Sequence, residues 1–404
     1  MKGAFDRRKF IKTSVAAGLG LSVAGSLVAS AGKAEGLSGK GVVGEGLPGK
    51  NIAGESLSAG AEETLAGRGE TAEALVAGEE VVLSEIGVVA KGKRVGVIGL
   101  DTSHALEVVK ELNAATPAQE YLGYKVVAAY PKGSLDIESS VKRIPGYTEE
   151  VKKLGVEIVD GVAALLEKVD VVMLETNDGR WHLEQGVQVM KAGKPLFIDK
   201  PLAASLADVF TIFEAAQHYN VPVFSASSLR YISGAAEINN GSIGKVLGVD
   251  AFSPANLEKT HPDLFWYGVH GVEILYTIMG TGCKEVKRVS TTDTEFVVGT
   301  WTDGRVGTFR GTRTGLHTYG GTVFGEKANA VLGPFEGYKP LFLEIIHFFE
   351  TGKPPVSAED TIEIYTFMEA ADESKRRNGQ AVGLDEIKAK AQKDAGDKMK
   401  KLLK

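Results

Sequence analysis

The stretch 170–202 constrains the fold more than any other part of this chain. It opens with the apolar run Asp170–Thr176, closes with the run Gly193–Pro201, and carries a helical pattern between them. The apolar face of that helix consists of Leu183, Val187 and Met190. A strand, a helix and a second strand of these lengths predict a βαβ unit in a parallel sheet.

The second strand of this unit delivers Asp199-Lys200-Pro201 at its carboxyl end. In an open α/β sheet, that end faces the ligand crevice. Lys200 is therefore placed to act on a bound substrate. The alternative for a single lysine before a proline is an exposed loop position without function.

Composition excludes several classes of protein. The 404 residues are enough for two domains, and the net charge of −6 with no basic patch argues against a nucleic-acid partner. Cys283 is the only cysteine, so an intramolecular disulfide and a cysteine-based zinc site are both excluded.

The N-terminus has the pattern of an export signal. Arg7 and Arg8 precede a moderately apolar run, Ser14–Ala29, followed by a small-residue cleavage site. We expect a twin-arginine signal peptide over 1–31 and a periplasmic or otherwise exported protein without a stable membrane anchor. The alternative is an uncleaved membrane helix, for which the run is short and rich in glycine. Residues 32–90 lack aromatic residues and sustained apolar periodicity, which predicts a flexible spacer.

Residues 91–226 alternate between strand and helix patterns. This alternation predicts a Rossmann-like doubly wound parallel sheet, which is an α/β fold. Ser205 is expected to cap one of its helices, with Asp208 as its capping-box partner.

The nucleotide-binding fingerprint after the first strand is altered. Gly99 supplies the first glycine of G-x-G-x-x-G, but Asp101 replaces the second and His104 the third. Lys132 and Ser134 follow the second strand, where an acidic residue is expected, and they favour a 2′-phosphate over a free 2′-hydroxyl. The motif alone does not decide whether this domain binds a dinucleotide.

Residues 227–385 change character. Successive strand patterns predict an α+β domain with a mostly antiparallel open sheet, and Thr302–Arg305 has the composition of a hairpin turn. An open sheet face of this kind favours a homodimer or homotetramer. Residues 386–404 are expected to form a charged C-terminal tail.

The motifs of residues 93–384, taken in order, resemble the glucose–fructose oxidoreductase, inositol dehydrogenase and rhizopine-catabolism family (Gfo/Idh/MocA). The matching segments are His182–Pro201, Ser228–Tyr231, Gly268–Glu273, Phe324–Lys327 and Gly352–Ser357. The resemblance implies an NAD(P)-dependent oxidoreductase that acts on a sugar or polyol, with NADP slightly favoured by Lys132 and Ser134. It also has departures, since Trp266 stands where the family has an aspartate before His270, and Glu273 replaces a later aspartate.

The resemblance also implies roles for particular residues. Lys200 and His270 would be catalytic, with Lys200 as general acid/base and His270 assisting. The expected cofactor-binding residues are Gly99, Asp101, Thr102, Ser103, His104, Lys132, Ser134, Thr176, Asn177, His182, Asp199 and Lys200. The expected substrate-binding residues are Arg230, Tyr231, Trp266, Tyr267 and His270. Packing at the domain junction is the alternative for the aromatic residues, and helix packing is the alternative for His270.

Three functions remain open from the sequence. The leading hypothesis is an exported NAD(P)-dependent oxidoreductase, the second a lyase or hydrolase that uses retained NAD(H) for transient oxidation, and the third a sugar-binding protein that has lost the cofactor.

We expect Asp101 to turn back and cap the following helix, so that Asp101→Ala would destabilise the protein mildly and leave cofactor affinity unimproved. A metal held by His104, Asp101 and either Glu175 or His270 has no supporting ligand spacing, and no metal is expected.

Overall fold

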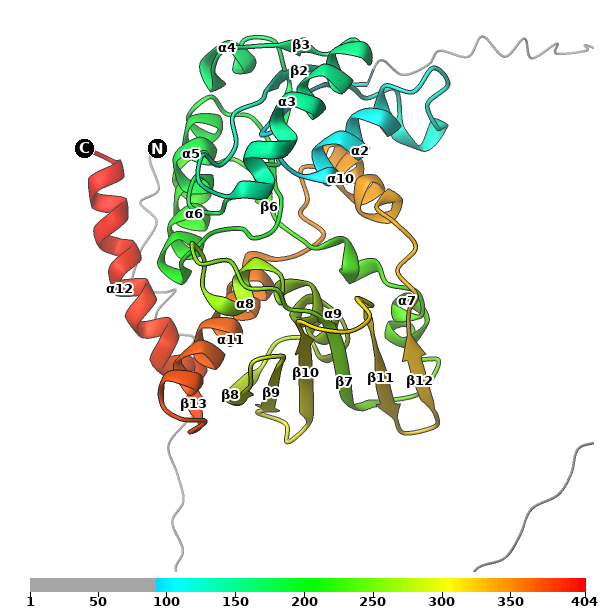
Figure 1. The fold of residues 1–404 in the computed structure, drawn as a ribbon, viewed down its shortest axis with the longest axis vertical. Helices are drawn as coiled ribbons and strands as arrows, with labels where there is room; N and C mark the ends of the chain where they lie inside the picture. The colour runs from blue at the N-terminus through cyan, green and yellow to red at the C-terminus, as the bar shows by residue number, and fades with distance from the viewer. Residues whose placement is uncertain (1–91) are drawn as a thin grey trace, which may run out of the picture. The chain divides into compact units, whose positions relative to one another are not determined.

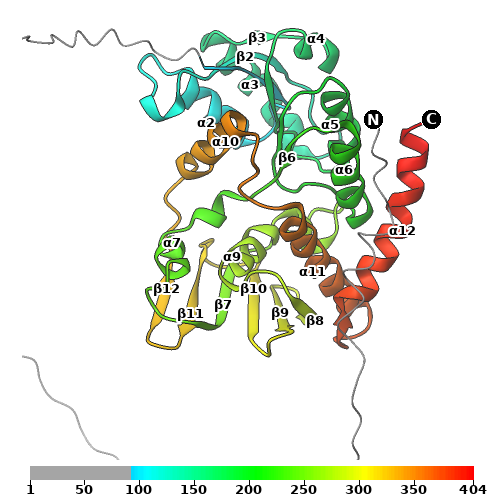
Figure 2. The same ribbon diagram turned by 180° about the vertical axis from the view of Figure 1, so that it is seen from behind.

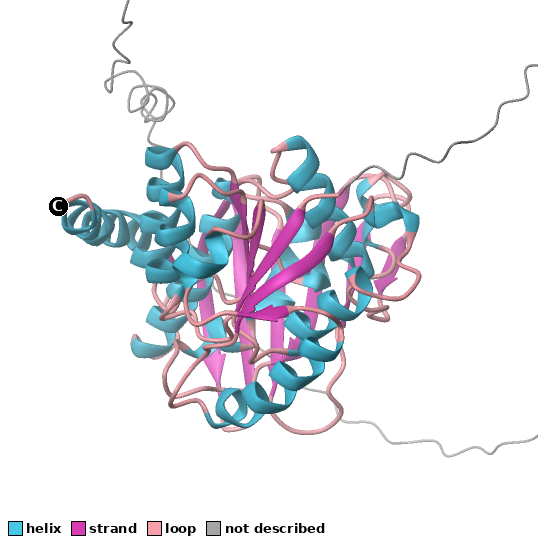
Figure 3. Ribbon diagram, turned by 90° about the horizontal axis from the view of Figure 1, so that it is seen from above, coloured by secondary structure: helices cyan, strands magenta, loops and turns pink. Residues whose placement is uncertain are grey.

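The computed structural model describes residues 92–404, and the expected signal peptide and spacer lie outside this range. Two sheets organise the described residues, as the sequence predicts (Figure 1). Helices lie on both sides of the strands when the molecule is seen from above (Figure 3). No helix in this part of the chain is both long enough and apolar enough to cross a membrane.

The first sheet is six-stranded and entirely parallel. Its strands, in spatial order, are β3 (Glu157–Ile158), β2 (Lys125–Tyr130), β1 (Arg94–Ile98), β4 (Val171–Leu174), β5 (Leu196–Ile198) and β6 (Val223–Phe224). The helices that connect them are α2 (Ser103–Leu112), α3 (Glu138–Lys153), α4 (Val162–Leu166), α5 (His182–Lys191) and α6 (Leu206–Tyr219). A short 3₁₀ helix, η1 (Gln119–Tyr121), precedes β2. This order is that of a doubly wound dinucleotide-binding sheet.

Local sequence explains the boundaries of these elements. Every residue of β4 is buried, which suits a central parallel strand covered on both faces. Gly193 ends the turn after α5 at φ +69°, a conformation that glycine adopts without strain. Ser205 caps α6 by accepting the backbone N–H of Asp208 at 3.1 Å, as expected.

The second sheet is seven-stranded and mostly antiparallel. Its strands, in spatial order, are β12 (Asn329–Leu332), β11 (Gly320–Gly325), β7 (Val246–Pro254), β10 (Val306–Thr312), β9 (Thr294–Trp301), β8 (Cys283–Ser290) and β13 (Val382–Gly383). Within it, β7 and β10 pair in parallel. The fold class predicted from the sequence is therefore confirmed.

The second domain also contributes helices. They are η2 (Ser228–Tyr231), α7 (Ala235–Asn239), α8 (Asp263–Trp266), α9 (Val269–Met279), α10 (Lys339–Thr351), α11 (Ala358–Arg376) and α12 (Leu384–Leu402). Of these, α9 and α11 cover one face of the second sheet.

Two of the late helices return to the first domain. Phe348 of α10 is fully buried and meets Phe224 of β6 edge to face, with ring centroids 4.8 Å apart. Figures 1 and 2 both show α10 beside α2, and α12 beside α6. The predicted domain boundary at residue 226 separates the two sheets. It does not separate their hydrophobic cores, because α10, which follows this boundary, is part of the core of the first sheet.

Two segments differ from the sequence prediction. The sequence shows no clear helical pattern over 138–153, yet α3 forms there despite Pro145 within it. Only Ser140 and Val151 of this helix are buried, so it lacks the apolar stripe that reveals a helix in a sequence. The segment 386–404, expected to be a charged tail, is mostly helical in α12, whose Ala391 and Ala395 are buried.

Candidate functional site

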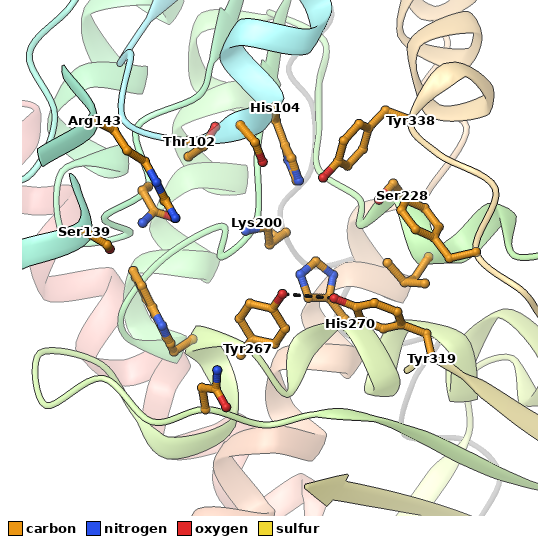
Figure 4. Close-up of a pocket in the computed structure, with 16 residues that line it drawn as sticks. Thr102, His104, Ser139, Arg143, Lys200, Ser228, Tyr267, His270, Tyr319 and Tyr338 are labelled. Atoms are coloured by element: carbon orange, nitrogen blue, oxygen red, sulfur yellow. Dashed lines mark hydrogen bonds between the residues drawn. The ribbon is translucent and has the colours of Figure 1, made fainter. Parts of the chain in front are cut away.

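A polar cavity of about 270 Å³ lies at the carboxyl edge of the first sheet, where the two domains meet. Its lining residues are Thr102, Ser103, His104, Ser139, Arg143, Asn177, Lys200, Ser228, Leu229, Asn256, Trp266, Tyr267, His270, Tyr319, Phe335 and Tyr338 (Figure 4). A volume of this size suits a single-ring metabolite and lies at the small end for ligand sites.

Lys200 reaches this cavity because β5 ends at Ile198 and the chain turns there. The residue is 8% exposed, and its Nζ lies 4.0 Å from Asp199 Oδ2. Figure 4 shows the Lys200 side chain between His104 and His270. The structure thus brings together Lys200 of the first domain and His270 of the second, which the sequence separates by most of a domain.

His270 is held in one orientation by Ser227. The Ser227 hydroxyl accepts the backbone N–H of Leu229 at 3.1 Å and lies 2.7 Å from His270 Nδ1. With its acceptor role used in this way, Ser227 can donate its proton to Nδ1, which leaves the N–H of a neutral imidazole on Nε2. Burial lowers the pKa of His270 well below its usual value, and the nearby charge of Lys200 adds to the effect. His270 is therefore a neutral hydrogen-bond donor at neutral pH.

Aromatic side chains enclose the same space. The hydroxyls of Tyr267 and Tyr319 lie 2.9 Å apart, and both rings meet His270 edge to face. Tyr338 packs on His104 with ring centroids 4.6 Å apart. Such a wall combines apolar ring faces with hydroxyl groups, a combination suited to a ligand with both C–H and O–H surface.

Lys200 adjoins a buried cluster formed by His104, Glu175 and Asp199. The His104 ring nitrogen Nδ1 lies 3.0 Å from the Asp199 carboxylate. Burial opposes ionisation of Asp199, but the charges of His104 and Lys200 outweigh it and lower its pKa to about 2. Burial and the charge of Asp199 together raise the pKa of Glu175 well above its usual value. Within residues 92–404, both oxygens of Glu175 lack a hydrogen-bond partner.

Asp101 does not cap α2, which corrects the expectation from the sequence. The cap is Thr102, whose side chain accepts the N–H of Ala105 at 3.2 Å. Asp101 is fully buried and accepts the backbone N–H groups of Asn177 at 2.9 Å and Ser134 at 3.1 Å. Burial raises the pKa of Asp101, although these two hydrogen bonds oppose the rise. Its carboxylate thus ties the loop after β1 to the loops after β2 and β4.

The loops after β2 and β4 are also bonded directly to each other. The Ser134 hydroxyl lies 2.8 Å from Asp178 Oδ2, and Arg180 bridges Asp178 and Asp136. Gly133 packs so closely on Asp101 that a Cβ added there would lie 2.1 Å from a carboxylate oxygen.

These bonds bear on whether a dinucleotide fits. In a doubly wound sheet the dinucleotide crosses the carboxyl end of the first strand, between the loops that follow its two neighbours. Here Asp101 and Ser134 join those loops, and His104 fills the third glycine position with an imidazole. As they stand, the residues do not fit an extended dinucleotide, whose binding would require the Ser134 bonds to Asp101 and Asp178 to open.

Several residues expected in the site lie elsewhere. Lys132 lies over the Trp181 ring at 5.8 Å, beside a different cavity. His182 is buried, and its ring nitrogens face the carbonyls of Thr176 at 2.6 Å and Leu202 at 3.2 Å. The Thr176 side chain donates to Gln185. These contacts hold the loop after β4 against the exit of β5.

Arg230 and Tyr231 also lie outside the lining of the cavity. Arg230 forms a buried ion pair with Glu273 at 2.6 Å, and burial raises the pKa of Tyr231. Both border a separate cavity next to α10. Trp266 and Tyr267, by contrast, line the same cavity as Lys200 and His270.

Other lining residues have no sequence signal that points to them. Arg143 comes from α3, which the sequence does not reveal as a helix, and its guanidinium donates to the Asp101 carbonyl at 3.3 Å. Tyr319, Phe335 and Tyr338 come from segments around β11 and before α10. Only the tertiary fold brings them to the sheet edge.

His261 supports the loop after β4 from the second domain. Its Nε2 accepts the Gly179 N–H at 3.1 Å, and its Nδ1 lies 2.8 Å from the Thr260 hydroxyl, an arrangement that suits a neutral ring. Burial lowers the pKa of His261 to about 4. The charged and titratable groups that face it are Asp178, Arg180, His182 and Asp136.

Comparison with known proteins agrees with this architecture. Residues 93–227 match the model of the Gfo/Idh/MocA family, described as an oxidoreductase family with an NAD-binding Rossmann fold. The first domain therefore resembles the NAD-binding Rossmann domain of this oxidoreductase family.

Individual relatives extend the likeness. Over 100 residues the chain is 36% identical to inositol 2-dehydrogenase of Gluconacetobacter diazotrophicus, a match that spans 23% of this chain and 30% of that relative. The fold covers 73% of the chain when aligned with a probable dehydrogenase from Thermotoga maritima, with a TM-score of 0.59, 22% identity and 99% of that chain covered. The structure of scyllo-inositol dehydrogenase of Lactobacillus casei, solved with NAD(H) and scyllo-inositol, aligns with 73% of this chain and 100% of its own, with a TM-score of 0.58 and 15% identity. At these identities the solved structures establish the fold.

Proposed function

We propose that this protein is an oxidoreductase that acts on a sugar or a related polyol in the cavity between its two domains. The observation that carries the proposal is the meeting of Lys200 and His270 in one small polar cavity at the carboxyl edge of a Rossmann sheet. The matching oxidoreductase family supports the reaction class, and the inositol dehydrogenase relatives support the substrate class.

The two residues have complementary roles in this proposal. His270, neutral and fixed by Ser227, donates from Nε2 to a substrate oxygen and orients it. Lys200 then exchanges the proton of the reacting hydroxyl through its Nζ. The buried Asp199 carboxylate lies 4.0 Å from that Nζ.

The lining suits a polyhydroxylated ring. Trp266 and Tyr267 offer aromatic faces to C–H groups, and Asn256 and Ser228 offer hydrogen-bonding side chains to hydroxyls. Arg143 adds a cation on the side of α3. These features support a neutral or weakly acidic sugar or cyclitol.

The structure supports a dinucleotide site less well than it supports a polyol site. The matched family is NAD-binding, but the loops after β2 and β4 are bonded together in this chain. Ser134 donates its backbone N–H to Asp101 and its hydroxyl to Asp178, so it is not free to bind a 2′-phosphate. Only Lys132 then remains as a reason to prefer NADP over NAD. This closure favours a second candidate, a polyol-binding protein that works without a dinucleotide.

A turnover assay tests the proposal and separates the two candidates. Purified protein is mixed with NAD or NADP and a panel of cyclitols and aldoses, and reduced nicotinamide is followed by absorbance. We expect reduction with at least one polyol by wild type and by Lys400→Met, whose lysine is exposed on α12. If polyols bind but no polyol supports reduction, the oxidoreductase proposal fails and the second candidate stands.

We further propose that the protein is exported by the twin-arginine route, on the strength of Arg7 and Arg8 before an apolar run. The double substitution of both arginines by lysine should leave folded precursor in the cytoplasm, as fractionation and immunoblotting would show. Export of that variant at the wild-type level would refute the assignment.

We also propose a homo-oligomer joined through the second sheet. The face of this sheet opposite α9 and α11 exposes apolar side chains, among them Phe252, Val289, Phe324 and Val331. Light scattering coupled to gel filtration should give a dimer or tetramer, and a monomer at micromolar concentration would contradict this.

A further inference from the structure

Three strands of the first sheet end around one buried cluster of potential metal ligands. His104 follows β1, Glu175 follows β4 and Asp199 follows β5, and each is buried. One ligand atom from each residue lies within 4.8 Å of the other two. The cluster combines one imidazole with two carboxylates.

The Glu175 carboxylate of this cluster lacks a donor, since neither of its oxygens has a hydrogen-bond partner among the described residues. The Asp199 carboxylate has one neighbour of this kind, His104 Nδ1 at 3.0 Å. Glu175 is 1% exposed and Asp199 is fully buried. Lys200 Nζ, at 4.0 Å from Asp199, is beyond hydrogen-bond distance. A buried carboxylate without a donor is costly, and natural proteins pair such groups with donors, cations or metals.

We propose that His104, Glu175 and Asp199 bind one divalent transition-metal ion, of the Mn²⁺ or Zn²⁺ kind. Carboxylate oxygens suit Mn²⁺, and an imidazole nitrogen beside them suits Zn²⁺ as well. Bonds of ~2.1 Å to a tetrahedral ion place the ligand atoms ~3.4 Å apart. His104 Nδ1 already lies 3.0 Å from Asp199, and all three ligand atoms lie within 4.8 Å of one another, so side-chain rotations of about an ångström would close the set on an ion.

The ion would lie at the floor of the substrate cavity. His104 belongs both to the cluster and to the cavity lining, and Lys200 lies directly after the ligand Asp199. The ion would neutralise two buried carboxylates and fix the carboxyl ends of β1, β4 and β5 relative to one another. This inference rests on the cluster alone and does not depend on the proposed function.

Metal analysis of the full chain tests the site. Tag-free protein is stripped with a chelator, dialysed against Mn²⁺ or Zn²⁺, and measured by mass spectrometry of its metal content and by calorimetric titration. We expect one ion per chain in wild type. Glu175→Gln preserves side-chain volume but removes the charge, and should weaken binding by ~100-fold.

Two further variants make the result interpretable. His104→Gln should weaken binding in the same way as Glu175→Gln, while Glu107→Gln, on the exposed side of the same helix, should bind like wild type. Circular dichroism establishes that each variant is folded. The proposal is overturned if wild type takes up no ion, which would indicate a proton on Glu175 instead, or if a folded Glu175→Gln variant binds the metal as tightly as wild type.

Discussion

Asp101 offers the sharpest test of how the carboxyl edge of the first sheet is built. Its buried carboxylate accepts two backbone N–H groups, from Asn177 at 2.9 Å and Ser134 at 3.1 Å. Asp101→Ala leaves both donors buried without an acceptor. Hydrogen bonds to a charged group contribute about 1.5–3 kcal/mol each, and removing a carboxylate that is costly to bury recovers part of this. We expect a loss of about 2–4 kcal/mol in the free energy of unfolding.

The same substitution should ease dinucleotide binding. If opening the loops costs about 3 kcal/mol, less than about one molecule in a hundred is open, and apparent affinity falls in proportion. Removing the Asp101 bonds should therefore tighten NAD binding by roughly tenfold or more. The sequence alone leads to the opposite expectation, because it places Asp101 at the helix cap.

Urea unfolding followed by circular dichroism measures the first effect, and calorimetric titration with NAD and NADP measures the second. Asp303→Ala is a suitable control, because Asp303 is exposed in a hairpin turn and should change little. A destabilisation below about 1 kcal/mol would refute the role of Asp101 as a buried tie. Unchanged nucleotide affinity in a destabilised variant would show that this tie does not obstruct the dinucleotide.

Three further predictions follow from other parts of the structure. Lys200→Met should lower turnover of the true substrate by about 100-fold or more while the melting temperature is retained, and normal turnover would remove Lys200 from the mechanism. Because the pKa of His261 falls from 6.5 to about 4 on folding, stability should be full above pH 6.5 and decline by about 3 kcal/mol as pH falls toward 4. His261→Gln should flatten this decline in pH-dependent urea titrations, and an unchanged slope would contradict the assignment. Phe348→Ala should cost about 3–5 kcal/mol, since α10 is part of the first core, and a loss below about 1 kcal/mol would show that it is not.

The elements that could be predicted are those with local signals. The βαβ unit of residues 170–202 has buried strands on either side of an amphipathic helix, and Gly193 and Ser205 end and begin helices by local chemistry. The hairpin at 302–305 likewise follows from its turn residues. Each of these depends on neighbours in sequence, so periodicity and caps are sufficient to find it.

The features that could not be predicted depend on contacts distant in sequence. The role of Asp101 is set by Ser134 and Asn177, which belong to two other loops. Tyr338 reaches the cavity only because α10 packs back on the first sheet. The cluster of His104, Glu175 and Asp199 has no motif spacing, since three strand ends assemble it.

The central claim is that the cavity shared by Lys200 and His270 is a polyol site, and direct binding tests it best. A panel of cyclitols and aldoses is titrated calorimetrically into wild type and into His270→Ala, without added nucleotide. We predict that at least one polyol binds wild type and binds the variant at least tenfold more weakly, since a buried hydrogen-bond donor to the ligand is lost. Absence of polyol binding to wild type, or equal affinity for a folded His270→Ala variant, would contradict the account.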